Sequence, residues 1–310
     1  MPSDTRLAAV DLGSNSFRLE IGRLDAGRLQ RVEYLKETVR LGGGLDKDGC
    51  LSPAAMAPAL ACLARFGARL AGLAPEQVRA VATQTLREAR NPDEFLVPAR
   101  QALGFPIEVI SGAEEARLIY QGAAYALPAS SERRMVVDIG GRSTELAVGA
   151  GTMPLHVESC PLGSVAWSMR FFANGELSAL AFEQAESAAA AVLGEAARAC
   201  MRAGWSQAYG CSGTIDAVAG ALAAAGRSPA PGAIDRAGLL WLRKKLLEAG
   251  HAERIRLVGI RDNRKPVIAG GLAVLRAVFE LLDLAQMRYT DGALRLGVLY
   301  GLMARGQVSA

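Results

Sequence analysis

The stretch Asp11-Leu-Gly-Ser-Asn-Ser-Phe-Arg-Leu-Glu-Ile-Gly22 aligns without gaps with Asp138-Ile-Gly-Gly-Arg-Ser-Thr-Glu-Leu-Ala-Val-Gly149. The aspartate, the first glycine, the serine, the leucine and the last glycine coincide in the two segments. Each segment follows an apolar run, at 7–10 and 135–137, that is typical of a buried strand. An internal repeat of this kind predicts that the chain carries one structural unit twice.

The residues around the two segments repeat an order of elements as well. Strands are expected near 7–10, 16–24 and 30–35 in the first half, and near 135, 144 and 153 in the second. Ser52 and Pro53 are a typical N-cap and first-turn residue for the helix that follows. The expected helices cover 53–72, 92–103, 113–126, 165–172, 178–203, 236–248, 266–282 and 293–304, and a further helix begins near 214. The later strands are expected at 78–83, 106–110, 207–209 and 287–290. Three strands followed by alternating helices and strands, stated twice, predict two related α/β domains.

The boundary between these domains is expected in the polar, proline-containing stretch 127–133. The predicted domains are therefore residues 1–127 and 128–310, and the final helix, 293–310, is free to pack back onto the first domain. Paired turns in two related domains predict a functional site in the cleft between the domains.

Composition narrows the class of protein. With 310 residues, 51% hydrophobic and 21% charged, the chain suits two soluble globular domains. The net charge of +4 permits an anionic partner without requiring one. No stretch is typical of a signal peptide or a membrane span, so no membrane is expected as a partner. No nucleic-acid partner is expected either. The five scattered cysteines fit a reducing compartment, and a cytoplasmic location is predicted.

The two histidines, His156 and His251, lie far apart in the sequence, and a structural role is favoured for each. Chemistry in this chain is therefore expected to rest on carboxylates, arginines, hydroxyls and backbone amides.

Both repeated segments end a strand with an aspartate, followed by glycine and small hydroxyl residues. Such a turn has little side-chain bulk, so its backbone amides can approach an anion and its hydroxyls add donors. The leading aspartates, Asp11 and Asp138, are placed to hold a hydrated Mg²⁺ ion, because Mg²⁺ prefers oxygen ligands. A dinucleotide-binding turn would enter a helix directly, whereas here the chain re-enters a strand. The phosphate-binding residues predicted in the two turns are Gly13, Ser14, Asn15 and Ser16, and Gly140, Gly141, Arg142, Ser143 and Thr144.

A third turn, Gly210-Cys-Ser-Gly-Thr214, leads from a strand into a helix, whose N-terminus favours an anion. Ser212, Gly213 and Thr214 are thus further phosphate-binding candidates, although a plain serine N-cap explains the turn equally well. Arg87 follows another strand and could grip phosphate as a charged fork, or it could be an exposed helix arginine.

Glu114 and Glu115 open the helix that ends the first half. Acidic residues in a first helical turn are favoured by the helix dipole, which is the simpler interpretation from spacing. Their expected position beside the domain cleft favours a functional one.

Together these segments resemble the exopolyphosphatase and guanosine pentaphosphate phosphohydrolase (Ppx/GppA) family, in its short two-domain form, over essentially the whole chain. The motifs that carry the resemblance are Asp11 to Arg18, Val39-Arg-Leu41, Thr85-Leu-Arg87, Ile110 to Arg117, Asp138 to Glu145, Gly210 to Thr214 and Asp291-Gly-Ala-Leu-Arg295. The resemblance implies the duplicated actin/Hsp70-like ATPase (ribonuclease H-like) fold.

The resemblance also implies an activity, namely Mg²⁺-dependent hydrolysis of the terminal phosphoanhydride of inorganic polyphosphate. The same motifs serve guanosine pentaphosphate or tetraphosphate, so the substrate stays open between the two. The family's catalytic carboxylate matches Glu115, and its further active-site acids match Asp138 and Glu145; Asp11, Asp138 and Glu145 are the expected metal ligands. A homodimer is a further expectation.

Two positions depart from the family pattern. Arg142 stands where the family has a third glycine, and it could either supply a cation to phosphate or crowd the site. Leu296 stands where an acidic residue is usual. These departures leave open a catalytically weak sensor of polyphosphate or alarmone, and a sugar kinase is a weaker alternative. The basic stretch 254–265 is either a solvated face or a track for distal polyphosphate.

Overall fold

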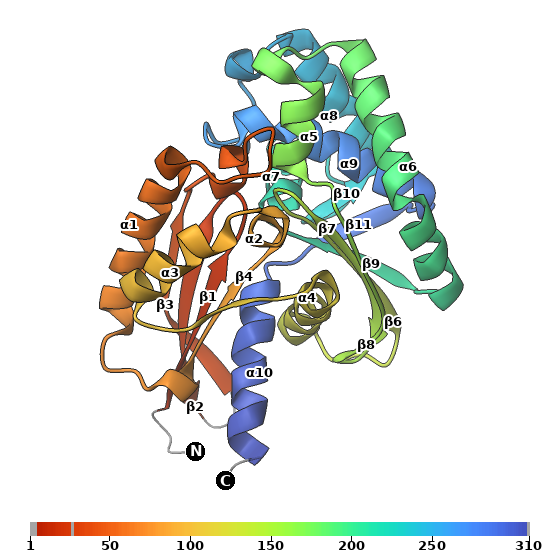
Figure 1. Ribbon diagram of the computed structural model, residues 1–310. Coiled ribbons are helices and arrows are strands. Elements are labelled where there is room, and N and C mark those ends of the chain that lie inside the picture. The colour runs from red at the N-terminus through yellow and green to blue at the C-terminus, as the bar shows by residue number, and fades with distance from the viewer. Residues whose placement is uncertain (1–4, 26–27, 309–310) are drawn as a thin grey trace. The chain divides into compact units, whose positions relative to one another are not determined.

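The computed structural model describes residues 5–25 and 28–308 (Figure 1). The chain divides into two compact units. Unit 1 comprises Met1–Gly122 and Leu294–Ala310, and unit 2 comprises Ala123–Ala293. Each unit contains one mixed sheet and a hydrophobic core of its own.

Unit 1 has a five-stranded sheet in the order β3-β2-β1-β4-β5. Its strands are β1 (Arg6–Leu12), β2 (Phe17–Asp25), β3 (Arg28–Glu37), β4 (Val78–Ala82) and β5 (Ile107–Val109). The first three strands are antiparallel neighbours, and β1, β4 and β5 run parallel. The carboxyl ends of β1 and β4 therefore meet at one edge of the sheet, which is where the first candidate turn begins.

The helices of unit 1 cover its sheet. They are α1 (Pro53–Leu70), α2 (Gln84–Glu88), α3 (Pro92–Leu103), α4 (Gly112–Ala126, which runs on into unit 2) and α10 (Leu294–Val308). Ser52 caps α1, because its Oγ accepts from the Ala55 amide at 3.3 Å, as its sequence predicts. Alternate residues of β1 join α1 and α3 in one core, while α10 packs against β1, β2 and β4. The last helix of the chain thus belongs to the first unit.

Unit 2 has a six-stranded sheet in the order β10-β11-β9-β6-β7-β8. Its strands are β6 (Arg133–Ile139), β7 (Thr144–Ala150), β8 (Met153–Cys160), β9 (Gln207–Cys211), β10 (Ala233–Asp235) and β11 (Gln286–Tyr289). Its helices are α5 (Ser164–Phe171), α6 (Ala179–Ala203), α7 (Gly213–Ala224), α8 (Arg236–Ala249) and α9 (Ile268–Leu281). The apolar side of β6 packs with these helices in the larger core.

The two sheets share one topology. The order β3-β2-β1-β4-β5 in unit 1 corresponds to β8-β7-β6-β9-β11 in unit 2, with β10 added at the edge. The last glycine of the repeat, Gly22 or Gly149, lies at a register shift in both units. A Cβ on Gly22 would lie 2.6 Å from Leu29 Cδ1, so a larger residue there would require the Leu29 side chain to move. This duplicated order is the actin/Hsp70-like ATPase (ribonuclease H-like) fold, which confirms the predicted fold class.

Two short elements were not predicted from the sequence. Helix α2 spans only Gln84–Glu88, and β10 only Ala233–Asp235. Neither is long enough to show a hydrophobic period, so pattern analysis cannot detect them.

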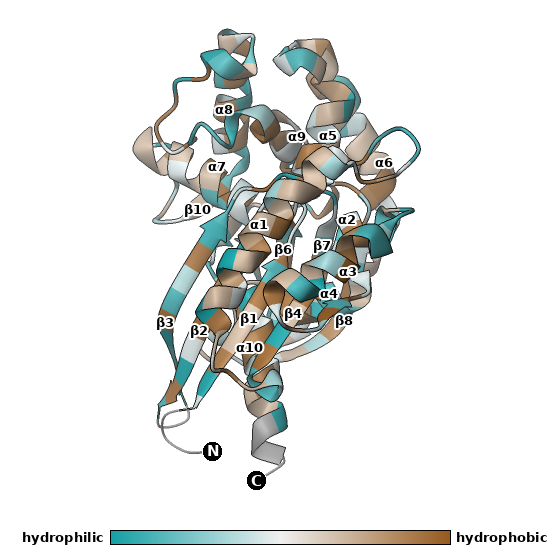
Figure 2. Ribbon diagram, turned by 60° about the vertical axis from the view of Figure 1, so that its left-hand side comes forward, coloured by the Kyte–Doolittle hydropathy of each residue, from teal (hydrophilic) through white to brown (hydrophobic). Residues whose placement is uncertain are grey.

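The hydropathy pattern explains why β3 can serve as an edge strand. Figure 2 shows hydrophilic and hydrophobic bands alternating along it, and charged side chains on its exposed side discourage pairing with another chain. None of the helices in the described part of the chain is long and apolar enough to cross a membrane.

Candidate active-site residues in the two units

In unit 1, the aspartate of the first turn faces an arginine. Asp11 and Arg18 are partners in the β1–β2 register, and Arg18 Nη1 lies 2.9 Å from Asp11 Oδ2. Asp11 is buried, so this ion pair occupies at least one of its carboxylate oxygens. The side chain predicted to bind a metal therefore already has a cationic partner within its own unit.

The backbone of the first turn is held by the chain that follows β3. The Arg40 amide donates to the Asn15 carbonyl at 3.0 Å, and the Gly42 amide donates to the Ser14 carbonyl at 2.7 Å. Arg40 adopts φ 56°, an unusual value for a residue with a side chain. Because the C=O and N–H of a trans peptide point in opposite directions, fixing these carbonyls turns the following amides away from residues 40–42.

Glu115 lies in the first turn of α4 and is buried. Arg87 Nη1 lies 2.8 Å from Glu115 Oε2 and also donates to the Ile110 carbonyl at 2.8 Å. The remaining donors of Arg87, Nε and Nη2, both reach Gln84 Oε1. The structure thus places the Arg87 guanidinium on Glu115 and its neighbours, and a phosphate contact by Arg87 stays a prediction.

The neighbouring Glu114 is bound differently. Arg117 donates to its carboxylate from Nε at 2.7 Å and from Nη2 at 2.8 Å, and Arg79 Nη2 lies 3.3 Å away. The hydrogen bonds from Arg117, followed by the charges of both arginines, hold the pKa of Glu114 below its usual value. Glu114 therefore has the bonding of a helix-start structural acid, whereas Glu115 lies apart from this network.

In unit 2, the aspartate of the second turn faces a glutamate. Asp138 and Glu145 are partners in the β6–β7 register, so their side chains leave the same face about 5 Å apart at Cβ. Both are buried. Ser159 Oγ donates to Glu145 Oε1 at 2.9 Å, and Cys211 Sγ lies 3.3 Å from Asp138 Oδ2. Strands β8 and β9 thus orient the two carboxylates.

The second turn is anchored at the start of α5. The Gly140 carbonyl accepts from Ser164, and the Gly141 carbonyl accepts from Val165 at 2.8 Å, so these carbonyls point toward the helix. A Cβ on Gly163 would lie 2.6 Å from the Arg142 amide nitrogen, so this contact requires glycine. The turn closes on itself through the Gly140 amide and the Ser143 carbonyl at 2.9 Å. The geometry directs the next backbone amides to the side away from α5.

Two predicted phosphate ligands of this turn, Thr144 and Arg142, differ in their surroundings. Thr144 is fully buried and its Oγ1 donates to the Leu162 carbonyl at 2.8 Å, so its hydroxyl supports the turn from within. Arg142 is half-buried, and it is not among the residues with positive φ. The arginine in place of the family's third glycine therefore causes no backbone strain.

The third turn combines a cap with a cation. Ser212 adopts φ 100°, and its Oγ accepts from the amides of Thr214 and Ile215, which is the bonding of an N-cap. A Cβ on Gly213 would lie 1.9 Å from Arg264 Nη2, so the Arg264 guanidinium rests directly on this glycine. Arg264 is buried, unlike the exposed Arg261 of the same basic stretch.

Arg264 is the main residue whose position sequence analysis missed. A guanidinium and a helix N-terminus, two features that favour an anion, adjoin there. The sequence showed only a basic stretch, and the contact between Arg264 and Gly213 becomes visible only when the helix and the loop are placed together. Both histidines are used in local contacts, as when His251 Nε2 lies 2.7 Å from the Asn174 carbonyl oxygen.

A metal ion has oxygen ligands available in unit 2. Among the residues that the structure describes, no three acidic, histidine or cysteine side chains gather in one place. The opposed carboxylates of Asp138 and Glu145 nevertheless suit Mg²⁺, which needs one or two carboxylates and otherwise keeps its waters.

The duplicated topology and the acid-bearing turns at the strand ends define a protein of the actin/Hsp70-like ATPase fold class. The model of the Ppx/GppA phosphatase family matches residues 21–306, and the chain belongs to this family. It is accordingly a hydrolase of phosphoanhydride bonds.

Solved structures agree with this assignment over the full chain. An exopolyphosphatase from Cytophaga hutchinsonii is 26% identical, with a TM-score of 0.86 over 97% of this chain and 98% of the other. The Ppx/GppA enzyme of Aquifex aeolicus is also 26% identical, with a TM-score of 0.76 over 96% and 99% of the two chains. A structure described as an exopolyphosphatase-like protein is 25% identical, with a TM-score of 0.86 over 99% and 100%.

Proposed function

We propose that the protein is an exopolyphosphatase that removes terminal phosphates from inorganic polyphosphate in the presence of Mg²⁺ and releases orthophosphate. The observation that carries this proposal is the register of β6 and β7, which sets Asp138 opposite Glu145 next to a turn whose amides face away from α5. Carboxylates for a divalent ion and amides for phosphate oxygens then lie side by side in one unit.

Mg²⁺ at Asp138 and Glu145 would neutralise charge on the phosphate oxygens during hydrolysis. The amides of Gly141 and Arg142 would bind the terminal phosphate. The backbone of Arg142 does not have a positive φ, so an arginine is accommodated at this position without strain. Arg264, at the N-terminus of α7, would bind a second phosphate of the same chain.

Glu115 is the proposed general base, which orients a water molecule and takes its proton. The ion pair with Arg87 supports this role, because it restricts where the Glu115 carboxylate can lie. Arg87 is then a positioning residue, and its expected contribution acts through Glu115. Three further expectations stay predictions. They are the binding of one substrate by both turns, a cytoplasmic location and a homodimer.

The substrate is tested by phosphate release from long polyphosphate, guanosine pentaphosphate and ATP with Mg²⁺ present. Faster release from polyphosphate than from both nucleotides supports the proposal. Faster release from guanosine pentaphosphate would mean that this nucleotide, which presents the same terminal anhydride, is the preferred substrate instead of polyphosphate.

The general base is tested by a matched pair of variants in adjacent positions. Glu115→Gln is expected to lower kcat by about a hundredfold to ten-thousandfold, the usual contribution of a general base. Glu114→Gln removes the neighbouring carboxylate, which Arg117 holds, and is expected to leave kcat within a few-fold. Equal losses in the two variants would contradict the role of Glu115.

A further inference from the structure

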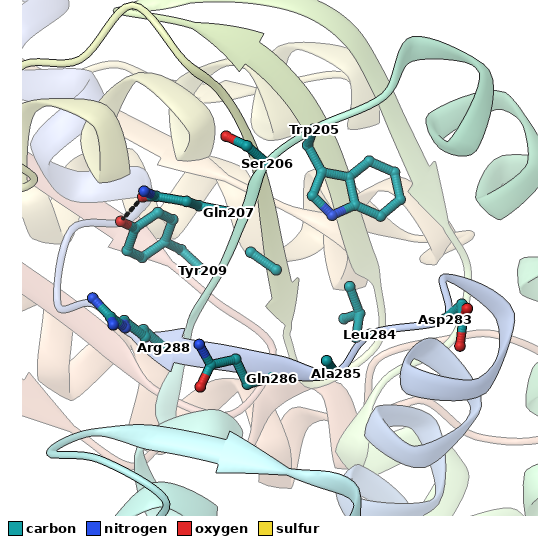
Figure 3. A pocket seen from close by; sticks show the side chains of 10 residues that line it. Trp205, Ser206, Gln207, Tyr209, Asp283, Leu284, Ala285, Gln286 and Arg288 are labelled. Carbon is teal, nitrogen blue, oxygen red and sulfur yellow. Dashed lines mark hydrogen bonds between the residues drawn. The ribbon is translucent and has the colours of Figure 1, made fainter.

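A pocket lies at the amino ends of the parallel strands β9 and β11 in unit 2 (Figure 3). Its volume is about 350 Å³, within the range of small-molecule sites. It is lined by Trp205, Ser206, Gln207, Ala208, Tyr209, Asp283, Leu284, Ala285, Gln286 and Arg288. The candidate phosphate turns follow the carboxyl ends of β6 and β9, so this pocket is at the other end of the strands.

One wall of the pocket is fixed by hydrogen bonds. Glu132 accepts from Ser206 Oγ at 3.0 Å and from Gln207 Nε2 at 3.1 Å. The Tyr209 hydroxyl donates to Gln207 Oε1, and the Arg134 guanidinium lies over the Tyr209 ring, 5.7 Å from its centroid. The side chains of this wall are therefore ordered before any ligand binds, which lowers the entropic cost of binding.

Other lining side chains have unused donors. Within the described residues, the side chains of Trp205, Gln286 and Arg288 have no hydrogen-bond or ion-pair partner. The acidic residue of the pocket, Asp283, is already bound by Arg236 at 2.7 Å. The pocket thus offers an indole N–H, a carboxamide and a positive charge without a counterion.

These groups are arranged along the length of the pocket. Trp205, Leu284 and Ala285 form an apolar end, and Trp205 lies across the pocket from Gln286 (Figure 3). Tyr209 and Arg288 are register partners and form the other end. Positions 205 and 209 are four residues apart, which is at most roughly 13 Å of chain. A ligand that matches this order has a planar ring at one end and an anion at the other.

We propose that this pocket binds a nucleoside monophosphate, with its base against Trp205 and Leu284 and its phosphate at Arg288. An aromatic ring and amide groups suit the face and edges of a base, and a guanidinium suits a phosphate. The proposal goes beyond the phosphatase activity and does not depend on it, because none of the lining residues belongs to the candidate active site.

Calorimetric titration of the full-length protein with GMP and with AMP tests the proposal, with guanosine and inorganic phosphate as separate probes. The nucleotides are expected to bind, and at least about tenfold more tightly than either part alone, since a charge-assisted hydrogen bond adds to ring contact. Arg288→Gln is expected to lower nucleotide affinity at least about tenfold for the same reason. Guanosine that binds as tightly as GMP, or no binding of either nucleotide, would overturn the proposal.

Variants decide where binding occurs. Arg227 is an exposed arginine elsewhere in unit 2, and Arg227→Gln is the matched control, with unchanged affinity expected. Trp205→Leu is expected to weaken GMP and guanosine alike, and if it fails to fold, Arg288→Gln alone decides. Nucleotide binding that persists unchanged in Arg288→Gln would mean a different site and overturn the inference. Phosphate release from polyphosphate by Arg288→Gln is expected to equal that of the parent protein.

Discussion

The two units hold their buried carboxylates in opposite ways. In unit 1, Asp11 faces Arg18 at 2.9 Å, and Glu20, the next inward-facing acid, lies 3.1 Å from Arg295. In unit 2, the residue that matches Arg18 in the repeat is Glu145, so Asp138 faces a second carboxylate. The backbone of the repeat is the same in both units, but the charge of one register partner is reversed.

This difference indicates how a duplicated fold can divide its work. An aspartate paired with an arginine is satisfied within its own unit and stabilises the turn. Two carboxylates that face each other in register form a suitable donor set for a divalent cation. We therefore propose the Mg²⁺ site in unit 2, and metal binding by Asp11 stays a prediction.

The largest expected effect comes from making unit 2 resemble unit 1. Glu145→Arg recreates the Asp–Arg pair at the second turn and removes a proposed metal ligand. We expect kcat to fall by about a hundredfold to a thousandfold or more, the size of losing one strong electrostatic contact in an active site. Phosphate release at several Mg²⁺ concentrations measures this effect.

Glu145→Gln is the control for side-chain size, because it keeps an acceptor for Ser159 and removes only the charge. A similar loss in both variants attributes the effect to the carboxylate. Full activity of Glu145→Gln with an unchanged dependence on Mg²⁺ would contradict the metal assignment. Asp11→Asn, which changes the matched residue of unit 1, is expected to leave that dependence unchanged.

The reverse exchange is expected to lower stability. Arg18→Glu places two carboxylates together in unit 1 and leaves Asp11, which is 3% exposed, without its guanidinium. Breaking such a pair from one side costs about 3 kcal/mol of unfolding free energy. Urea unfolding measures the loss, and added Mg²⁺ is expected to restore part of it. If Arg18→Glu were as stable as the parent protein, the ion pair would not be what holds the first turn.

The sequence was sufficient for the fold because the repeat combines pattern with turn chemistry. The matched segments after Asp11 and Asp138 predicted both sheets, and Ser52 predicted the start of α1. The sequence could not show which partner each carboxylate faces. That information lies in strand register and in long-range contacts, such as Arg264 against Gly213, which no local pattern contains.

A smaller stability effect is expected where the chain's last helix meets the first sheet. Glu20 is 1% exposed and is bound by Arg295 of α10 and by Arg31 of β3. Arg295→Ala leaves one of these two pairs, so we expect a loss of about 2 kcal/mol, below the cost of leaving a buried charge wholly unpaired. Arg69→Ala breaks the more exposed pair with Glu33 and is the control, with a loss of about 1 kcal/mol or less. Equal losses would mean that the Arg295 pair does not anchor α10.

The smallest effect concerns the paired acid beside the proposed base. Arg117 and Arg79 hold the pKa of Glu114 below its ordinary value of 4.5. The ion pairs of Glu114 therefore stabilise the folded protein fully at pH values above 4.5, the pKa in the unfolded chain. This stabilisation is lost as the pH falls through the lower pKa of the folded protein. Glu114→Gln is expected to be about 1 kcal/mol or less below the parent protein at pH 7, because the group is partly exposed. The difference should shrink as pH falls below 4.5, since the parent protein then loses the same ion pairs. Urea unfolding of both proteins from pH 7 to pH 3 measures it, and a difference that stayed constant over that range would show that the ionised carboxylate is not its source.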